Sequence, residues 1–126
     1  MSTFNNNSID SIATDSPYGI SFMNRSWDKF TPKSFENFSY KWGLKAIEIL
    51  KPGSYLINFS HPRRYHRMVC GLEDAGFFIK DMIIWVNGQG FPKNDNYLKP
   101  SIEPIVLSQK PYKGSVKDNL EKWRVG

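Results

Sequence analysis

The amino-acid sequence predicts an α/β protein, a three-layer sandwich in which helices cover a mostly parallel β-sheet. Strand-like and helix-like hydrophobic patterns alternate along the chain, which is typical of right-handed βαβ units. The chain has 126 residues, of which 40% are hydrophobic and 15% aromatic, so it can bury one core but not two. We therefore expect a single, partial domain over residues 1–126, with residues 1–7 and 113–126 as flexible ends.

The first strand and the first helix are predicted in the N-terminal part of the chain. Residues 8–14 form a short apolar stretch that runs into a proline-stiffened loop. A helix begins near Thr31 and Pro32, because threonine is a good N-cap and proline suits the first helical position. Residues 51–53, Lys-Pro-Gly, end it. Its apolar stripe consists of Phe35, Phe38, Trp42, Ala46 and Ile49.

The second strand covers residues 54–59, and the second helix runs from Pro62 to Gly76. Arginines lie largely off the apolar face of this helix. That apolar face consists of Tyr65, Met68, Val69, Leu72 and Ala75.

Two further strands and a polar tail complete the pattern. Residues 77–86 are β-branched and aromatic, residues 87–100 form a loop rich in glycine and proline, and residues 103–108 form a last short strand. Because no helical pattern separates these two strands, we expect the terminal strand to pair antiparallel. The tail that follows is polar and has helical character.

Composition and residue types narrow the classes of function. The net charge of +5 and the pI near 9.4 favour a polyanionic partner. The lone Cys70 excludes an internal disulfide, and His61 and His66 lack neighbours at metal-ligand spacing, so we expect no metal site. The sequence has no apolar run of about 20 residues, and its polar start has no signal-peptide core, so we expect a cytoplasmic protein without a membrane partner.

The segment Asp15-Ser16-Pro17-Tyr18 carries the most specific chemical pattern. It follows the first strand, and ligands of such sheets bind at the carboxyl ends of the strands. A carboxylate and a neighbouring main-chain carbonyl provide two acceptors for the hydrogens of one amino group, and an aromatic ring can stack on a base. Pro17 favours an extended conformation for the residue before it, which would direct that carbonyl. These residues suit methylation of a nucleobase amino group.

This segment resembles the (D/N/S)PPY motif of the amino-group DNA methyltransferases. Further blocks resemble those of phage and bacterial DNA methylases in the same order, and the resemblance extends from about Ser8 to Pro111. The blocks are SIDSIATDSPYGISFMNRSWDK, ILKPGSYLINF, YHRMVCGLEDAGFFIKDMIIWVNGQGFPK and LKPSIEPIVLSQKP. Four collinear blocks are much more specific than one short motif.

The resemblance implies a Rossmann-like class I methyltransferase fold and double-stranded DNA as the partner. It implies transfer of a methyl group from S-adenosylmethionine to the amino group of a flipped base, without a metal. The first residue of the motif favours adenine N6 over cytosine N4. Asp15, Ser16, Pro17 and Tyr18 are the implied catalytic residues, and Asp15 is also a candidate cofactor contact.

The sequence departs from the family at two points. Ser16 stands where the family usually has proline. The cofactor-binding strand, with its aspartate-proline-phenylalanine and glycine-rich turn, has no counterpart, since Gly88 and Gly90 lie between two strands. We therefore expect an incomplete domain: a truncated gene, a partial sequence, or one chain of a split enzyme whose other half is separate. The alternatives are an inactive remnant that binds DNA or another partner, and an amino-methyltransferase acting on RNA or protein.

Several residues outside the motif are candidates for binding the base or the DNA. They are Phe22, Arg63, Arg64, Trp85, Phe91 and Lys93. Each has a structural alternative. The arginines can form the solvated face of a helix, Trp85 can pack in the core, and Lys93 can be a surface lysine. The motif itself can be a turn that ends a strand.

Overall fold

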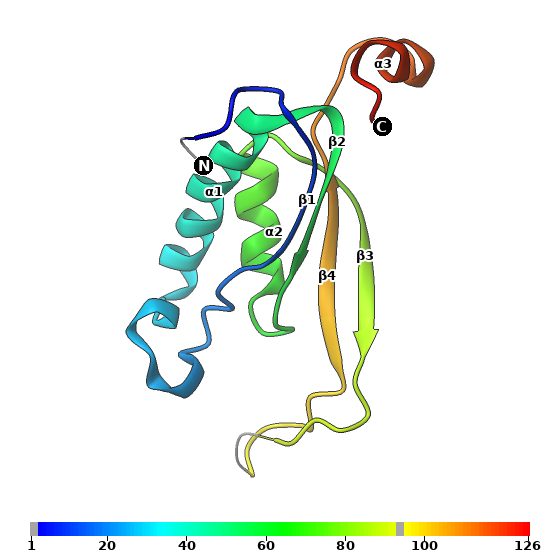
Figure 1. The fold of residues 1–126 in the computed structure, drawn as a ribbon. Helices are drawn as coiled ribbons and strands as arrows, with labels where there is room; N and C mark the ends of the chain where they lie inside the picture. The colour runs from blue at the N-terminus through cyan, green and yellow to red at the C-terminus, as the bar shows by residue number, and fades with distance from the viewer. Residues whose placement is uncertain (1–2, 93–94) are drawn as a thin grey trace.

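Four strands form one sheet with two long helices packed on the same face of it (Figure 1). The structure is a computed structural model that describes residues 3–92 and 95–126. Its elements are β1 (Ile9–Asp15), α1 (Pro32–Ile49), β2 (Leu50–Phe59), α2 (Tyr65–Asp74), β3 (Phe78–Val86), β4 (Ile102–Gln109) and α3 (Val116–Trp123), with short 3-10 helices at Phe22–Asn24 and Ser26–Asp28.

The strands lie in the order β1-β2-β4-β3. β1 and β2 pair parallel, and β4 pairs antiparallel with both β2 and β3. Three strands therefore run in one direction, and the last strand of the chain is antiparallel, as predicted. It lies inside the sheet rather than at an edge, because it pairs with β3 as a hairpin on one side and with β2 on the other. The carboxyl ends of β1, β2 and β3 and the amino end of β4 consequently lie at the same end of the sheet.

The first helix begins where its sequence signals place it and ends at Ile49, before the predicted turn. The Thr31 hydroxyl accepts a hydrogen bond from the Ser34 N–H, the Ser34 hydroxyl accepts one from the Thr31 N–H, and Pro32 opens the helix. The chain then enters β2 directly at Leu50, so residues 51–53 belong to the strand and not to a turn. No helix within the described parts of the chain is long and apolar enough to cross a membrane.

The core lies between the sheet and the helices. Both predicted helical stripes face it, with their buried members at its centre and their aromatic and β-branched members packed around them. Close packing of α1 on α2 depends on Gly71, where an added Cβ would lie 2.5 Å from the Glu36 carbonyl oxygen. The buried cluster comprises Phe35, Ala46, Leu50, Leu56, Met68, Leu72, Ala75, Phe77 and Val106.

The opposite face of the sheet is open in the described part of the chain. α1 and α2 lie on one side in Figure 1, so the described residues provide two of the three expected layers. Side chains of the open face include Ile83, 44% exposed, and Trp85, 59% exposed. The interpretation of Trp85 as a core residue is therefore wrong, because β3 is an edge strand and Trp85 lies on its uncovered face.

The predicted helical character of the C-terminal tail is confirmed. Ser115 and Asp118 form a capping box at the start of α3. The buried side chain of Asn119 ties the helix to the sheet, since its amide donates hydrogen bonds to the carbonyls of Pro52 at 3.0 Å and Val125 at 2.7 Å.

Candidate functional site

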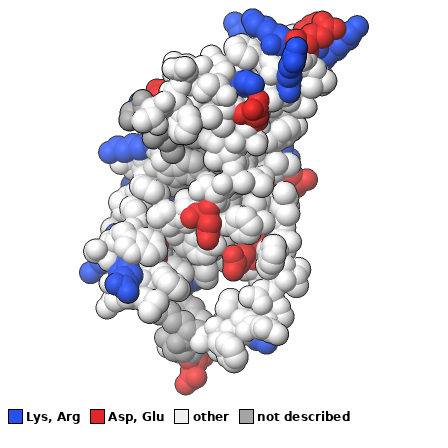
Figure 2. Space-filling view, in the orientation of Figure 1, with Lys and Arg blue, Asp and Glu red and all other residues white. Residues whose placement is uncertain are grey.

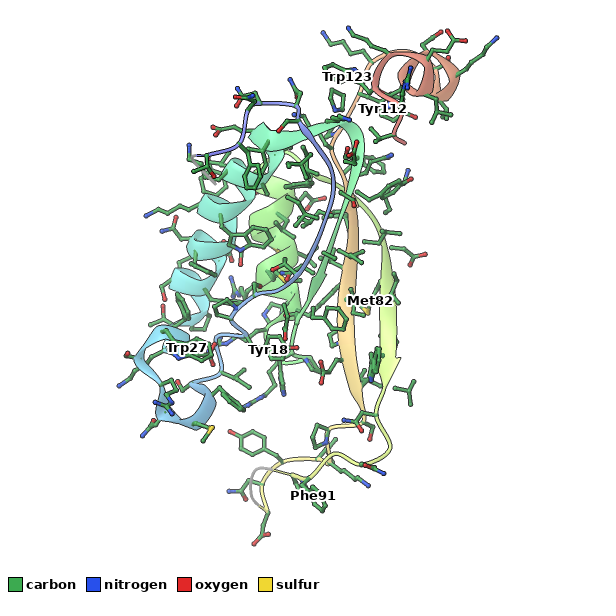
Figure 3. The ribbon with its side chains drawn as sticks, in the orientation of Figure 1. Tyr18, Trp27, Met82, Phe91, Tyr112 and Trp123 are labelled. Carbon is green, nitrogen blue, oxygen red and sulfur yellow. The ribbon has the colours of Figure 1, made fainter. Side chains whose placement is uncertain are left out.

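The predicted motif lies at the carboxyl end of β1, where it lines a cavity of about 390 Å³. The structure brings the motif together with two aromatic side chains and a second carboxylate. The lining residues are Asp15, Ser16, Pro17, Tyr18, Phe22, Trp27 and Asp28. Figure 3 shows Tyr18 and Trp27 at this end of the sheet. A cavity with aromatic walls and acceptor groups suits a planar molecule that carries an amino group.

The Tyr18 phenol is held by a carboxylate of another strand. Its hydroxyl donates a hydrogen bond to Glu103 Oε2 at 3.0 Å. Burial raises the pKa of Tyr18 well above its ordinary value of 10.0, and the carboxylates of Glu103 and Asp15 raise it further. The phenol therefore stays protonated as a donor, and its ring keeps a defined position beside Asp15.

Ser16 is held by Asn58, a residue of the neighbouring strand. The Ser16 N–H donates to Asn58 Oδ1 at 3.3 Å, and Asn58 Nδ2 donates to Ser16 Oγ at 2.9 Å. Asn58 is fully buried at the end of β2. The residue at the position of the family's usual proline is thus fixed by two hydrogen bonds.

Asp28 organises the loop that follows the motif. Its buried carboxylate accepts hydrogen bonds from the backbone N–H groups of Gly19 at 2.6 Å, Ile20 at 3.1 Å and Phe22 at 2.7 Å. Gly19 has a φ of +67°, and a Cβ there would lie 2.6 Å from the Phe35 ring, so this turn requires glycine. The carboxylate therefore sets the path of the backbone that forms one wall of the cavity.

The two candidate arginines at the start of α2 contact other parts of the site. Arg64 Nε donates to the Gly19 carbonyl at 3.0 Å, and the Arg63 guanidinium lies 4.5 Å from the centroid of the Tyr97 ring. Arg64 therefore supports the loop that follows the motif, and Arg63 contacts the loop between β3 and β4, so neither faces only solvent. On the side drawn in Figure 2, basic and acidic side chains gather together over α3, and no continuous basic surface extends across the middle.

Trp85 and Phe91 are not among the residues that line the cavity. Trp85 is opposite Glu103 in the β3–β4 ladder, and its ring centroid lies 6.5 Å from that of Phe59. Phe91 is 86% exposed on the loop beyond β3 and β4, and Figure 3 places it apart from Tyr18. Lys93 lies outside the described residues.

The described residues fit a target base better than they fit a cofactor. Asp15 is the one predicted cofactor contact at the cavity. Gly90 packs closely against Pro100, where an added Cβ would lie 1.9 Å from the carbonyl oxygen. Within residues 3–92 and 95–126, no three side chains of His, Cys, Asp or Glu gather as metal ligands.

Three residues that shape the site were not predicted from the sequence: Asp28, Asn58 and Glu103. Asn58 and Glu103 act through contacts with residues distant in sequence, and Asp28 accepts from backbone groups six to nine positions before it, so no local pattern reveals them. Asn58 had the clearest signal, because it is a polar residue at the buried end of an apolar strand.

Known proteins resemble this chain in sequence and in fold. A profile of the family described as DNA methylase matches residues 9–125. The type II methyltransferase M.HindIII of Haemophilus influenzae is 31% identical, over 79% of this chain and 40% of its own length. The chain thus spans about two fifths of that relative.

Solved structures share the fold. A protein of Thermus thermophilus, solved in complex with S-adenosyl-L-methionine, superposes with a TM-score of 0.60 at 20% identity, over 99% of this chain and 56% of its own. The PvuII DNA methyltransferase, which is cytosine-N4-specific, gives a TM-score of 0.64 at 11% identity, over 93% of this chain and 49% of its own.

Proposed function

The chain belongs to the DNA methylase family, and on that premise we propose that it forms the target-base part of an enzyme that methylates an amino group of a base in double-stranded DNA. One observation carries the proposal: Asp15, Ser16 and Tyr18 line one cavity at the carboxyl end of β1, together with the aromatic residues Phe22 and Trp27. Few reactions need a carboxylate, a directed carbonyl and an aromatic wall in one place.

The residues of the motif hold and orient the amino group. A nucleobase amine is a weak nucleophile, because its lone pair is delocalised into the ring. The Asp15 carboxylate and the Ser16 carbonyl accept its two hydrogens, which keeps the lone pair free for attack. The rings of Tyr18, Phe22 and Trp27 enclose the flipped base and exclude water. After transfer, the surplus proton on nitrogen passes by way of Asp15 to solvent.

S-adenosylmethionine supplies an electrophilic methyl group in this reaction when it is bound. The methyl carbon would bond to the amino nitrogen while the carbon–sulfur bond breaks, with its electron pair remaining on sulfur. Asp15 lines the cavity and would hold a hydrogen of that nitrogen, and its charge is opposite to that of the sulfonium, so it is the residue proposed to contact both partners.

We propose adenine N6 as the acceptor in preference to cytosine N4. The motif begins with aspartate, whereas the cytosine members that it resembles more often begin with serine. The fold does not separate the two, because the cytosine-N4-specific PvuII enzyme shares it. Digestion of the methylated DNA to nucleosides and mass spectrometry should reveal N6-methyladenine; N4-methylcytosine would refute this preference.

The DNA and the rest of the enzyme are assigned to two surfaces of the chain. Arg63 and Arg64 are proposed to meet phosphates beside the cavity, and Phe22, Trp85 and Phe91 to contact bases. The cofactor-binding half is proposed to cover the rest of the open face of the sheet, including Ile83, while it leaves Trp85 accessible to DNA. Such a complex would act in the cytoplasm of a bacterial cell or of a phage-infected host.

An inactive module that binds DNA or another partner is the second candidate. It is favoured by one observation: the sequence has no counterpart of the family's aspartate-proline-phenylalanine and glycine-rich cofactor segment. For residues 1–126 by themselves we expect weak or no binding of S-adenosylmethionine in a calorimetric titration. Tight stoichiometric binding would show that this chain is sufficient.

The decisive experiment compares Asp15→Ala with the wild type in the full-length protein, using labelled S-adenosylmethionine and duplex DNA. We expect turnover to fall by about 100-fold or more, with DNA affinity changed by about threefold or less. Asp10→Ala is the matched control, since Asp10 lies on the same strand and its side chain is 70% exposed. Equal turnover in Asp15→Ala would remove Asp15 from the mechanism, and no transfer by the wild type would favour the inactive module.

A further inference from the structure

The side chain of Asn58 lies on the face of the sheet that packs against the helices, next to the motif. It pairs with Thr14 in the parallel ladder, two residues before Ser16. Its side chain is fully buried, and its Nδ2 also contacts the sulfur of Met68 in α2. Asn58 is therefore fixed by the core before any ligand binds.

The contact between Asn58 and Ser16 involves both ends of the asparagine amide. Oδ1 accepts the Ser16 N–H at 3.3 Å, and Nδ2 donates to Ser16 Oγ at 2.9 Å. Two bonds to atoms on either side of the Ser16 Cα restrict both its φ and its side-chain rotamer. Pro17 restricts the remaining backbone angle, because a residue before proline is confined to extended ψ values.

Proline at position 16 could not make this contact. Proline has no N–H to donate and no hydroxyl to accept, and its ring restricts φ covalently instead. The serine in this chain leaves φ free by itself. The buried asparagine supplies the missing restraint through hydrogen bonds.

We propose that Asn58 is a positioning residue that directs the Ser16 carbonyl, taking over the role of the proline that the motif usually carries at this place. The inference rests on the proposed function, in which that carbonyl accepts a hydrogen of the target amino group. It adds a residue to the site that has no contact with the base. It also predicts that serine at position 16 and asparagine at position 58 depend on each other.

The interdependence is tested by combining Ser16→Pro with Asn58→Leu in the full-length protein. Alone, Ser16→Pro should lower the urea midpoint of unfolding, because it leaves the buried Asn58 amide without two of its partners. In the Asn58→Leu background the same change should not lower the midpoint. Asn58→Leu alone should reduce kcat by about tenfold with little change in KM, and adding Ser16→Pro should restore most of it. Equal effects of Ser16→Pro in both backgrounds would overturn the proposal.

Asn119→Leu is the matched control, since Asn119 is a buried amide bonded to carbonyls remote from the motif. It should lower the urea midpoint without changing the response to Ser16→Pro. If Asn58→Leu does not fold, Ser16→Ala tests the same contact. The side-chain amide protons of Asn58 should then exchange with solvent about tenfold faster. An unchanged exchange rate would overturn the contact.

The readouts separate this inference from the proposed function. The unfolding midpoints and amide exchange do not require activity. If the protein transfers no methyl group but shows the interdependence, the contact between Asn58 and Ser16 is supported and the proposed function is refuted. Normal kcat in Asn58→Leu would overturn the positioning role and leave the function intact.

Discussion

The Tyr18 hydroxyl donates a hydrogen bond to the Glu103 carboxylate at 3.0 Å, across 85 positions of sequence. This contact joins the loop after β1 to the start of β4. It is possible because β4 runs antiparallel inside the sheet, so that its amino end lies at the same end of the sheet as the carboxyl end of β1, one strand away. The ring of Tyr18 is thus oriented by Glu103, a residue of the last strand.

Glu103→Gln should lower the pKa of Tyr18 while leaving it above 10.0, because burial is the largest cause of the raised value. Above pH 10 the folded protein keeps a proton that the unfolded chain releases, so stability falls as pH rises. The variant should lose less stability over this alkaline range. Absorbance of tyrosinate at about 295 nm, with the titration of Tyr18→Phe subtracted, isolates the group. An unchanged titration of Tyr18 would contradict the role of Glu103.

Asp28→Asn should destabilise the protein by about 2 kcal/mol or more. The carboxylate accepts three backbone N–H groups, and an amide cannot accept all three or supply the negative charge. Urea unfolding measures the loss. Asp10→Asn is the control and should cost about 0.5 kcal/mol or less, because its ion pair with Lys51 is exposed on the aspartate side. Equal losses in both variants would show that the buried carboxylate has no special role.

Gly71→Ala should destabilise the packing of α1 on α2 by about 1–3 kcal/mol, despite the better helix propensity of alanine. Its Cβ would lie 2.5 Å from the Glu36 carbonyl oxygen and 2.8 Å from the Ser39 Cβ. Gly88→Ala is the matched control, since an added Cβ there meets nothing within 4 Å. The midpoint of thermal unfolding should be clearly lower for Gly71→Ala than for Gly88→Ala. An unchanged midpoint in Gly71→Ala would show that the two helices can move apart without loss of stability.

Arg63→Gln should reduce the slope of log Kd for DNA against log salt by about 1, as expected for the loss of one phosphate contact. Arg64→Gln should have the same effect and also lower turnover, because Arg64 Nε holds the Gly19 carbonyl beside the cavity. Lys117→Gln, on the charged surface of α3, serves as the control with an unchanged slope. Slopes equal to that of the wild type would remove the arginines from the DNA interface.

The amino-acid sequence by itself determined the features that depend on neighbours along the chain. The helix from Pro32 to Ile49 follows from a threonine cap, a proline at the first turn and apolar residues at helical spacing. The motif at the end of β1 follows from four consecutive residues whose groups suit one reaction. Such signals are local, because capping, periodicity and turn formation act over a few residues.

Only the tertiary structure decided which distant residues complete the site. Ser16 meets Asn58 at 42 positions of separation, and Tyr18 meets Glu103 at 85. The first contact exists because β1 pairs parallel with β2, and the second because β4 inserts between β2 and β3, an order that hydrophobic patterns do not encode. Trp85 likewise lies exposed on an apolar strand because that strand is at the edge of the sheet. A hydrogen bond between strands depends on register and direction, and those are set by the packing of the whole sheet.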